Sequence, residues 1–383
     1  MREGWTYKKL GDYIKEYSVK NKAGKDIPVY SVTNSQGFCK EYFSKEIASQ
    51  DKTSYKIVPY GFFAFNPSRI NVGSIDWQHK EEQVIVSPLY NVFSVSESVL
   101  QPYLLYYLKS PATIKYIDAI ATGTVRLNLK LSMLKDFSIP LPSLSEQQAI
   151  VSELDKINEL ISLKKAQLSD LDALAQSIFY DMFGDPIENE KGWEVKKLED
   201  VCETITDGDH MPPPKSENGI PFITISDINK ETRKIDFNNT FYVPQEYYDG
   251  LKEERKAQIN DLLYTVTGSY GIPVVVKSNM PFCFQRHIAL IRPIQEKVLT
   301  IFLCYWVLCP SVKGEADRVA TGIAQKTVGL NSIRQFDIIL PPLPLQQEFA
   351  KRIELIEQQK VQISSTIKDL ETLLASRMQY WFD

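Results

Sequence analysis

The sequence LPSLSEQQAIVSELDKINELISLKKAQLSDLDALAQSIFYDMFGD, residues 141–185, occurs twice in this chain. A second version, LPPLPLQQEFAKRIELIEQQKVQISSTIKDLETLLASRMQYWFD, occupies residues 340–383. Leu141 aligns with Leu340 and Phe183 with Phe382, so a constant shift of 199 positions superimposes the two copies without a gap. The chain therefore carries a duplicated segment, around which the remaining sequence is arranged.

Each copy has apolar residues at alternating steps of four and three, the pattern of a coiled-coil seam. Lys164, Lys360 and Arg377 interrupt the pattern, and we expect Lys164 and Lys360 to fix the helix register. A helix over 150–182 would be about 50 Å long at 1.5 Å per residue. The seam residues are Ile150, Leu154, Ile157, Ile161, Leu168, Leu171, Ala175, Ile178 and Met182, then Phe349, Ile353, Ile356, Ile363, Ile367, Leu370, Leu374 and Trp381.

Length and composition indicate a soluble globular protein. The 383 residues suggest two or three domains, and the 43% hydrophobic and 24% charged residues are ordinary for that class. Five scattered cysteines without CxxC spacing predict reduced thiols in a cytosolic protein, with neither a disulfide framework nor a zinc site. No apolar run predicts a membrane span or a signal peptide, so we expect a cytoplasmic location.

The net charge of −4 is unusual for a protein that binds nucleic acid. Neutralisation of phosphates supplies much of the affinity for DNA, so free DNA-binding domains are usually basic. If this chain binds DNA, it does so with local basic loops or in a complex whose other subunits bring positive charge.

The duplication extends beyond the long segments. GWTYKKLGD at residues 4–12 returns as GWEVKKLED at 192–200, LLYY at 104–107 faces LCYW at 303–306, and ATG occurs at 121–123 and 320–322. The chain is therefore a tandem repeat of one globular unit followed by one long helix.

Each globular unit mixes strand and helix patterns, which predicts an α+β fold. Pro140 and Pro341 are expected to end any structure ahead of the long helices. The predicted strands are 28–32, 61–65, 83–86, 91–95, 221–225, 261–266, 273–276 and 287–291, and short helices are predicted at 101–108 and 300–307. The predicted domains are a globular domain at 1–140, a long helix at 141–184, a linker at 185–191, a globular domain at 192–339 and a long helix at 340–383.

Catalytic motifs are weak or missing. No GxxxxGK[ST] loop is present, so ATP hydrolysis is not expected. Asn66-Pro67-Ser68-Arg69 departs from the amino-methyltransferase tetrapeptide, and the Glu-x-Lys at Glu194 is missing from the first copy of that segment. The three histidines lack metal-ligand spacing, and residues 207–210 read as an exposed loop. We therefore predict no catalytic residue, no metal and no cofactor in this chain.

Divergent polar loops at equivalent places of the two units are the remaining functional candidates. Arg, Lys, Asn, Gln, Ser and Thr side chains pair with base edges, and backbone amides at Gly turns suit phosphates. The alternative for any single loop is a solvated turn. The predicted DNA contacts are Thr33, Asn34, Ser35, Gln36, Asn66, Arg69, Asn71, Thr124, Arg126 and Asn128, then His210, Lys215, Thr267, Ser269, Tyr270, Gln285, Arg286, His287, Gln325, Lys326 and Thr327.

Several short motifs recur in a fixed order along the whole chain. They are Gly192-Trp193 with Leu198, the IPLP that leads to Glu146-Gln147-Gln148, the MFGDP at residues 182–186, and the LPPL that leads to Gln346-Gln347. With these motifs the chain resembles the specificity subunits of type I restriction-modification systems. It departs from them at Leu345, where the family commonly has Glu before the Gln pair.

The resemblance implies two target-recognition domains, each reading one half of an interrupted double-stranded DNA sequence, joined by an antiparallel coiled coil of the long helices. It implies two adenine methyltransferase subunits on that coiled coil, and restriction subunits further out. S-adenosylmethionine, ATP and Mg²⁺ are then expected on the partner subunits. The candidate partner-binding residues are Gln147, Gln148, Gln346 and Gln347.

A second function is compatible with the same sequence. A tandem scaffold could use its coiled coil to assemble other proteins, with polar loops that contact nothing. Such a scaffold would show no salt-dependent, sequence-selective binding to DNA even with a methyltransferase present.

Overall fold

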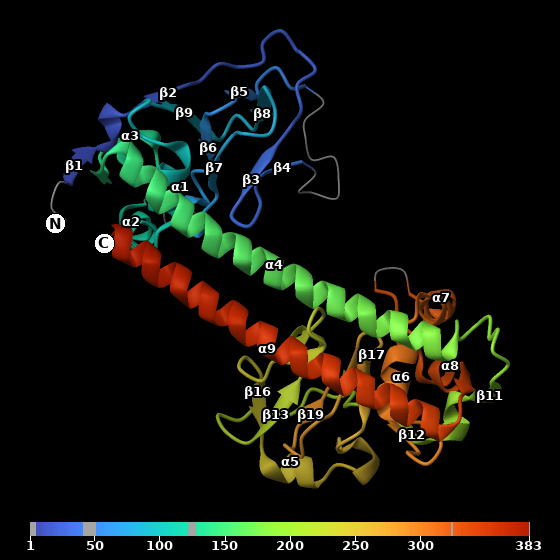
Figure 1. The fold of residues 1–383 in the computed structure, drawn as a ribbon. Coiled ribbons are helices and arrows are strands. Elements are labelled where there is room, and N and C mark those ends of the chain that lie inside the picture. Colours follow the sequence, from blue (N-terminus) through green and yellow to red (C-terminus); the bar gives the residue numbers. More distant parts are fainter. Residues whose placement is uncertain (1–4, 41–50, 122–127, 323–324, 383) are drawn as a thin grey trace. The chain divides into compact units, whose positions relative to one another are not determined.

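The structure of the chain, a computed structural model, describes residues 5–40, 51–121, 128–322 and 325–382 (Figure 1). Two compact units are present: Met1–Ala166 together with Ser364–Asp383, and Gln167–Ile363. The predicted long helices are α4 (Leu144–Phe183) and α9 (Leu343–Phe382), each 40 residues long. The unit boundaries fall within these helices, so each helix contributes to both units. In the described part of the chain no helix is long and apolar enough to cross a membrane.

The first unit is built on a four-stranded antiparallel sheet in the order β2-β9-β6-β7. Its strands are β1 (Thr6–Lys9), β2 (Ile14–Glu16), β3 (Ser31–Thr33), β4 (Gly37–Cys39), β5 (Lys56–Pro59), β6 (Phe63–Phe65), β7 (Ile75–Trp77), β8 (Gln83–Val86), β9 (Asn91–Val95) and β10 (Ser138–Leu141). Its short helices are α1 (Gln101–Lys109), α2 (Pro111–Ile120) and α3 (Leu131–Lys135), with 3-10 turns η1 (Leu10–Asp12) and η2 (Ile70–Val72).

The second unit repeats this plan, with its main sheet in the order β12-β20-β17-β18. Its strands are β11 (Glu194–Lys197), β12 (Cys202–Asp207), β13 (Ile220–Ile223), β14 (Ile228–Asn229), β15 (Lys234–Ile235), β16 (Phe241–Val243), β17 (Leu262–Thr265), β18 (Pro273–Val275), β19 (Cys283–Phe284), β20 (Ile288–Pro293) and β21 (Asp337–Leu340). Its short helices are α5 (Gln245–Asp249), α6 (Thr300–Val307), α7 (Pro310–Val319) and α8 (Leu330–Arg334), with 3-10 turns η3 (Leu198–Val201), η4 (Ile225–Asp227) and η5 (Glu253–Arg255). The predicted fold of mixed helices and strands, duplicated along the chain, is confirmed.

The prediction that prolines end the structure ahead of the long helices was wrong for Pro140. This residue lies inside β10, opposite Tyr7 of β1. Because β1 is the only strand paired with β10 in the described sheets, Pro140 can face away from the ladder without the loss of a hydrogen bond. Helices α2 and α7, which follow α1 and α6 and each begin with a proline, were not predicted.

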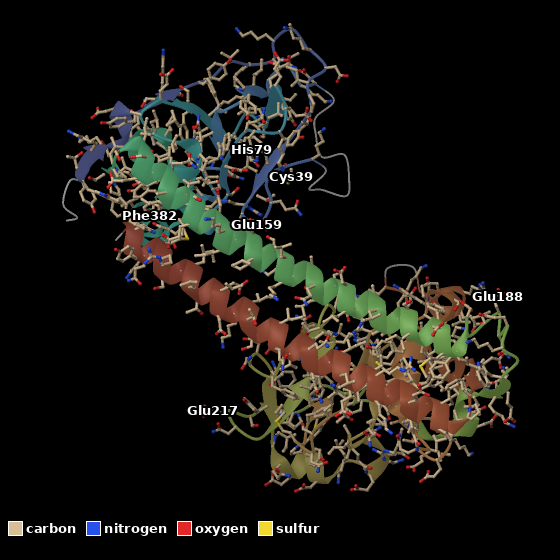
Figure 2. All side chains as sticks on the ribbon, viewed as in Figure 1. Cys39, His79, Glu159, Glu188, Glu217 and Phe382 are labelled. Atoms are coloured by element: carbon tan, nitrogen blue, oxygen red, sulfur yellow. The ribbon has the colours of Figure 1, made fainter. Side chains whose placement is uncertain are left out.

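The core of each unit is completed by the end of the long helix that follows the other globular segment. In the first unit Phe382 of α9, labelled in Figure 2, packs on Tyr103 of α1 with 5.5 Å between ring centroids. In the second unit Phe183 of α4 packs on Phe302 of α6 and Phe349 of α9, at 4.9 and 5.3 Å. Phe183 and Phe382 are the same position of the repeat, as are Phe302 and Tyr103. Each unit therefore needs both halves of the sequence.

Charged side chains in the apolar seam are paired across the two helices. In the first unit Arg377 of α9 bonds to Glu153 of α4, with 3.1 Å between Nη2 and Oε2. In the second unit Lys360 of α9 lies 2.9 Å from Asp172 of α4, which also accepts a 2.8 Å bond from Arg233. Burial opposes the ionisation of Asp172, but the bonds and charges of Lys360 and Arg233 outweigh it and hold its pKa below the usual value. A second contact between the helices, Lys165 with Glu371 in the first unit and Phe183 with Phe349 in the second, shows that α4 and α9 are antiparallel within each unit.

The first glutamine of each Gln pair ties its long helix to the globular segment before it. The buried Gln147 side chain accepts a 2.9 Å bond from the Leu100 amide and donates to the carbonyls of Ser98 and Pro142, at 3.0 and 3.1 Å. Gln346 makes the matching set of three bonds in the second unit. These two glutamines therefore set the position of each helix start.

We predict that Gln147→Ala lowers the free energy of unfolding by about 1–3 kcal/mol, because it leaves a buried amide and two carbonyls without their partner. The exposed neighbour Gln148 provides the matched control, and Gln148→Ala should change the stability by less than about 0.5 kcal/mol. Urea unfolding followed by circular dichroism measures both. Equal effects of the two substitutions would contradict the structural role of Gln147.

Candidate DNA interface

In the first unit, predicted residues from separate loops meet at one end of the main sheet, where β6 ends and β7 and β9 begin. The β3–β4 hairpin, the β6–β7 connection and the residue before β9 surround a cavity of about 230 Å³. Its lining includes Thr33, Asn34, Asn66, Arg69, Val72, Ser74 and Tyr90. We name this face the first reading edge.

Local hydrogen bonds fix the loops of the first reading edge. Asn66 Oδ1 accepts a 3.0 Å bond from the Ser68 amide, and Thr33 Oγ1 accepts one of 3.1 Å from the Gln36 amide. Ser74 Oγ donates to the Val32 carbonyl at 2.5 Å and so joins the two loops. The side chains of Thr33 and Asn66 thus hold the turns, whereas those of Asn34 and Arg69 are exposed.

A buried carboxylate anchors the hairpin. Asp76 of β7 accepts a 2.9 Å bond from the Phe38 amide. Gly37 has a φ of +59°, and a Cβ atom there would lie 1.9 Å from Asp76 Oδ2. Only glycine allows this close approach. The contact with Asp76 of β7 therefore holds the β3–β4 hairpin, and with it Asn34, in place.

The other predicted residues of the first unit lie around this edge or outside the described residues. Ser35 and Gln36 are exposed in the hairpin, and Asn71 is half-buried in η2. The Leu129 amide bonds to the Pro67 carbonyl at 3.0 Å, which brings the exposed Asn128 beside the β6–β7 connection. Thr124 and Arg126 lie outside the described residues.

In the second unit, predicted loops also meet at one sheet edge, here called the second reading edge. Asp209 and Gln285 form a parallel bridge, and the Val266 amide bonds to the His287 carbonyl at 2.9 Å. Thr267 and Thr327 form an antiparallel bridge, with 3.2 Å between their hydroxyl oxygens. The loops around residues 209, 267, 286 and 327 are therefore neighbours.

The two reading edges share one backbone frame. The Leu129 amide meets the Pro67 carbonyl in the first unit, and the Val328 amide meets the Val266 carbonyl at 2.9 Å in the second. These are the same positions of the repeat. The side chains that follow the frame differ, because Pro67 is followed by Ser68 and Arg69 in the first unit, whereas Val266 is followed by Thr267 and Gly268 in the second.

A network of charged side chains joins residues of the second reading edge. Arg255 Nη1 is 3.4 Å from Asp209 Oδ1, and His210 Nε2 is 3.0 Å from Asp207 Oδ2. The Tyr247 hydroxyl donates to Asp209, and burial together with that bond raises the pKa of Tyr247. The sequence did not point to Arg255 and Tyr247, because they lie far from residue 209 along the chain and approach it only in the fold.

The remaining predicted residues of this edge differ in how their side chains are engaged. The exposed Arg286 lies 3.4 Å from His287, and burial together with the Arg286 charge lowers the pKa of His287. Tyr270 donates a 2.6 Å bond to Asp317, and Lys215 lies over the Phe241 ring. The Ser269 carbonyl accepts a bond from Thr265, and Gln325 and Lys326 are exposed. Within the described ranges, no group of three or more His, Cys, Asp or Glu side chains could hold a metal ion.

The predicted partner-binding glutamines divide into two kinds. Gln148 and Gln347 are exposed and available to a partner. Gln147 and Gln346 are fully buried and bonded within the chain, which corrects their prediction as partner contacts. Exposed apolar side chains that lie outside the seam were not predicted; they include Leu160 and Leu163 on α4 and Leu355 and Val361 on α9.

Known proteins that resemble this chain include specificity subunits of type I restriction enzymes. It is 24% identical to the EcoBI specificity subunit of Escherichia coli over 65% of this chain and 57% of that one, just over half of the relative's length. It is 23% identical to the putative MjaX specificity subunit of Methanocaldococcus jannaschii over 97% and 93% of the two chains. A solved chain from a study of type I restriction-modification assembly and conformational transition has a TM-score of 0.61 at 18% identity, covering 100% of this chain and 98% of its own length.

A family model described as the type I restriction modification DNA specificity domain matches residues 2–173 and again residues 190–372. The chain belongs to this family and carries its domain twice. The resemblance seen in the sequence motifs is confirmed, and the two matches follow the internal duplication.

We predict that Gly208→Ala destabilises the second unit by about 1–3 kcal/mol, because its Cβ atom would lie 1.8 Å from the Phe284 carbonyl oxygen. Gly314 of α7 provides the control, since a Cβ atom there meets nothing within 4 Å. Gly314→Ala should stabilise the protein by up to about 1 kcal/mol through helix propensity. Thermal unfolding measures both; a neutral Gly208→Ala would contradict the close approach of the two loops.

Proposed function

We propose that the chain is the DNA-recognition subunit of a type I restriction-modification complex and reads a two-part DNA sequence. Each reading edge contacts one part. The observation that carries the proposal is the repeated loop frame: two sheet edges with the same backbone pairing present different polar side chains. The same backbone arrangement with different side chains is what two domains need if each binds DNA in the same way but recognises a different base sequence.

The side chains of the reading edges have the chemistry of base recognition. Arg pairs with guanine and Asn or Gln with adenine, in both cases through two hydrogen bonds in the major groove. The first edge offers Arg69 and Asn34, and the second offers Arg286 and Gln285. Loops fixed by buried contacts, such as the hairpin held by Asp76, lose little conformational entropy on binding.

The long helices are proposed to form one antiparallel coiled coil that sets the gap between the two parts of the site. A seam of about 50 Å corresponds to roughly fifteen base pairs at ~3.4 Å each. Lys360 and Arg377 support a single register, because each has an acidic partner on the facing helix, and a slipped register would leave these charges unpaired.

Catalysis is proposed to reside on partner subunits. Two modification subunits would bind the exposed apolar residues of α4 and α9, such as Leu163 and Leu355. They would supply S-adenosylmethionine and much of the positive charge for DNA, which accounts for the net charge of −4 in this chain. ATP and Mg²⁺ would serve the restriction subunits.

We predict that Arg69→Ala, in the complex with the modification subunit, weakens binding to the cognate DNA duplex by about 1–3 kcal/mol, or roughly 5- to 150-fold. Competition with variant duplexes should show relaxed specificity in one half of the site only, while Arg286→Ala relaxes the other half.

The exposed Lys115 of α2 lies on another element of the first unit, so Lys115→Ala removes one positive charge as a control. Its affinity should equal that of the unaltered chain at the same salt concentration. If Arg69→Ala and Lys115→Ala both leave affinity and specificity unchanged, Arg69 does not read DNA. If the unaltered complex itself shows no sequence preference, the scaffold function is favoured.

A further inference from the structure

The connection between β8 and β9 is a rigid turn at the first reading edge. The Tyr90 amide bonds to the Ser87 carbonyl at 3.0 Å, and Pro88 restricts the backbone between them. Tyr90 lines the cavity that Asn34 and Arg69 also line, and its carbonyl accepts a 2.6 Å bond from Lys56 Nζ. The turn is therefore part of the reading edge and is held in place.

Leu89 lies in this turn with 78% of its surface exposed. Isolated exposed leucines are common and usually need no explanation. This one is distinguished by its place, because it directly precedes Tyr90, which lines the same cavity as the arginine and asparagine that we assign to base recognition. The exposed Val72 adds a second apolar side chain to the lining of the same cavity.

Thymine is the one base that presents a methyl group in the major groove, and apolar side chains recognise it by contact. We propose that Leu89 contacts the 5-methyl group of a thymine in the half-site read by the first unit. The inference rests on the proposed function and deepens it, since it assigns one base to one side chain. The contact would bury about one methyl group, which corresponds to roughly a fourfold change in affinity.

The second unit supplies a counterpart for comparison. Met211, 77% exposed, directly follows His210 and is itself followed by three prolines. The loop that corresponds to the Leu89 turn carries Arg286 and His287 instead. Leu89 and Met211 are thus matched in exposure and differ in the half-site that their units read.

The test replaces thymines by deoxyuridine, which differs only by the absence of the 5-methyl group. The full chain in complex with its modification subunit binds duplexes of its mapped methylation motif, each with one thymine replaced. Dissociation constants are compared for the unaltered chain, Leu89→Ala and Met211→Ala. Both residues are exposed, and circular dichroism confirms that the variants are folded.

The proposal expects one thymine in one half-site at which deoxyuridine weakens the unaltered chain about fourfold. Leu89→Ala should bind the thymine and deoxyuridine duplexes equally at that position, while Met211→Ala keeps the fourfold difference. A Leu89→Ala chain that retains the difference at every thymine would overturn the proposal, as would the absence of any sensitive thymine in that half-site. If the unaltered complex binds motif and scrambled duplexes equally, the proposed function fails first, and the Leu89 contact with it.

Discussion

The burial of the last apolar side chains of each long helix is the constraint on which the rest of the structure depends. Phe183 is fully buried against the second unit, and Phe382 is 6% exposed against the first. Loss of a buried Phe side chain costs about 3–5 kcal/mol, a large part of the 5–15 kcal/mol that stabilises a typical domain. The units are therefore not independent along the sequence, and each is assembled from both copies of the repeat.

Polar contacts fix the position of each long helix in this apolar packing. Hydrophobic burial alone tolerates small slips along a helix pair, whereas the hydrogen bonds that Gln147 and Gln346 accept from the Leu100 and Leu299 amides form only at one position of each helix start. Lys360 and Arg377 add paired charges at positions where the first copy has Ile161 and Ile178. The two copies of the repeat therefore share one backbone plan but differ in the charges of their long helices.

The long helices and the duplication could be predicted from sequence because their signals extend over many residues. Strands β8 and β9 and helix α6 have the predicted bounds, since composition changes sharply at their ends. The place of Pro140 in β10 was missed because a strand with one neighbour tolerates proline. Gln147 was predicted as a partner contact because local sequence does not show that Leu100 and Ser98 fold back onto it.

The candidate site likewise combines features that the sequence predicted with features that only the fold reveals. Residues 66–69 and 267–270 could be selected because they lie near the same place of the repeat and their composition is polar. Sequence alone could not show that Arg255 and Tyr247 bond to Asp209, because 38 or more positions along the chain separate them from it. Nor could it show that Thr33 and Asn66 use their side-chain oxygens to hold their own turns, which leaves Arg69 and Asn34 as the exposed readers.

The most direct test of the central claim is a map of N6-methyladenine across the genome of cells that express this chain with its modification subunit. The account predicts one two-part motif with a fixed gap, absent without this chain. Replacement of residues 1–140 by the corresponding segment of a relative should change one part of the motif and leave the other part and the gap unchanged. Adenine methylation that is independent of this chain, or a motif that the replacement does not alter, would contradict the account.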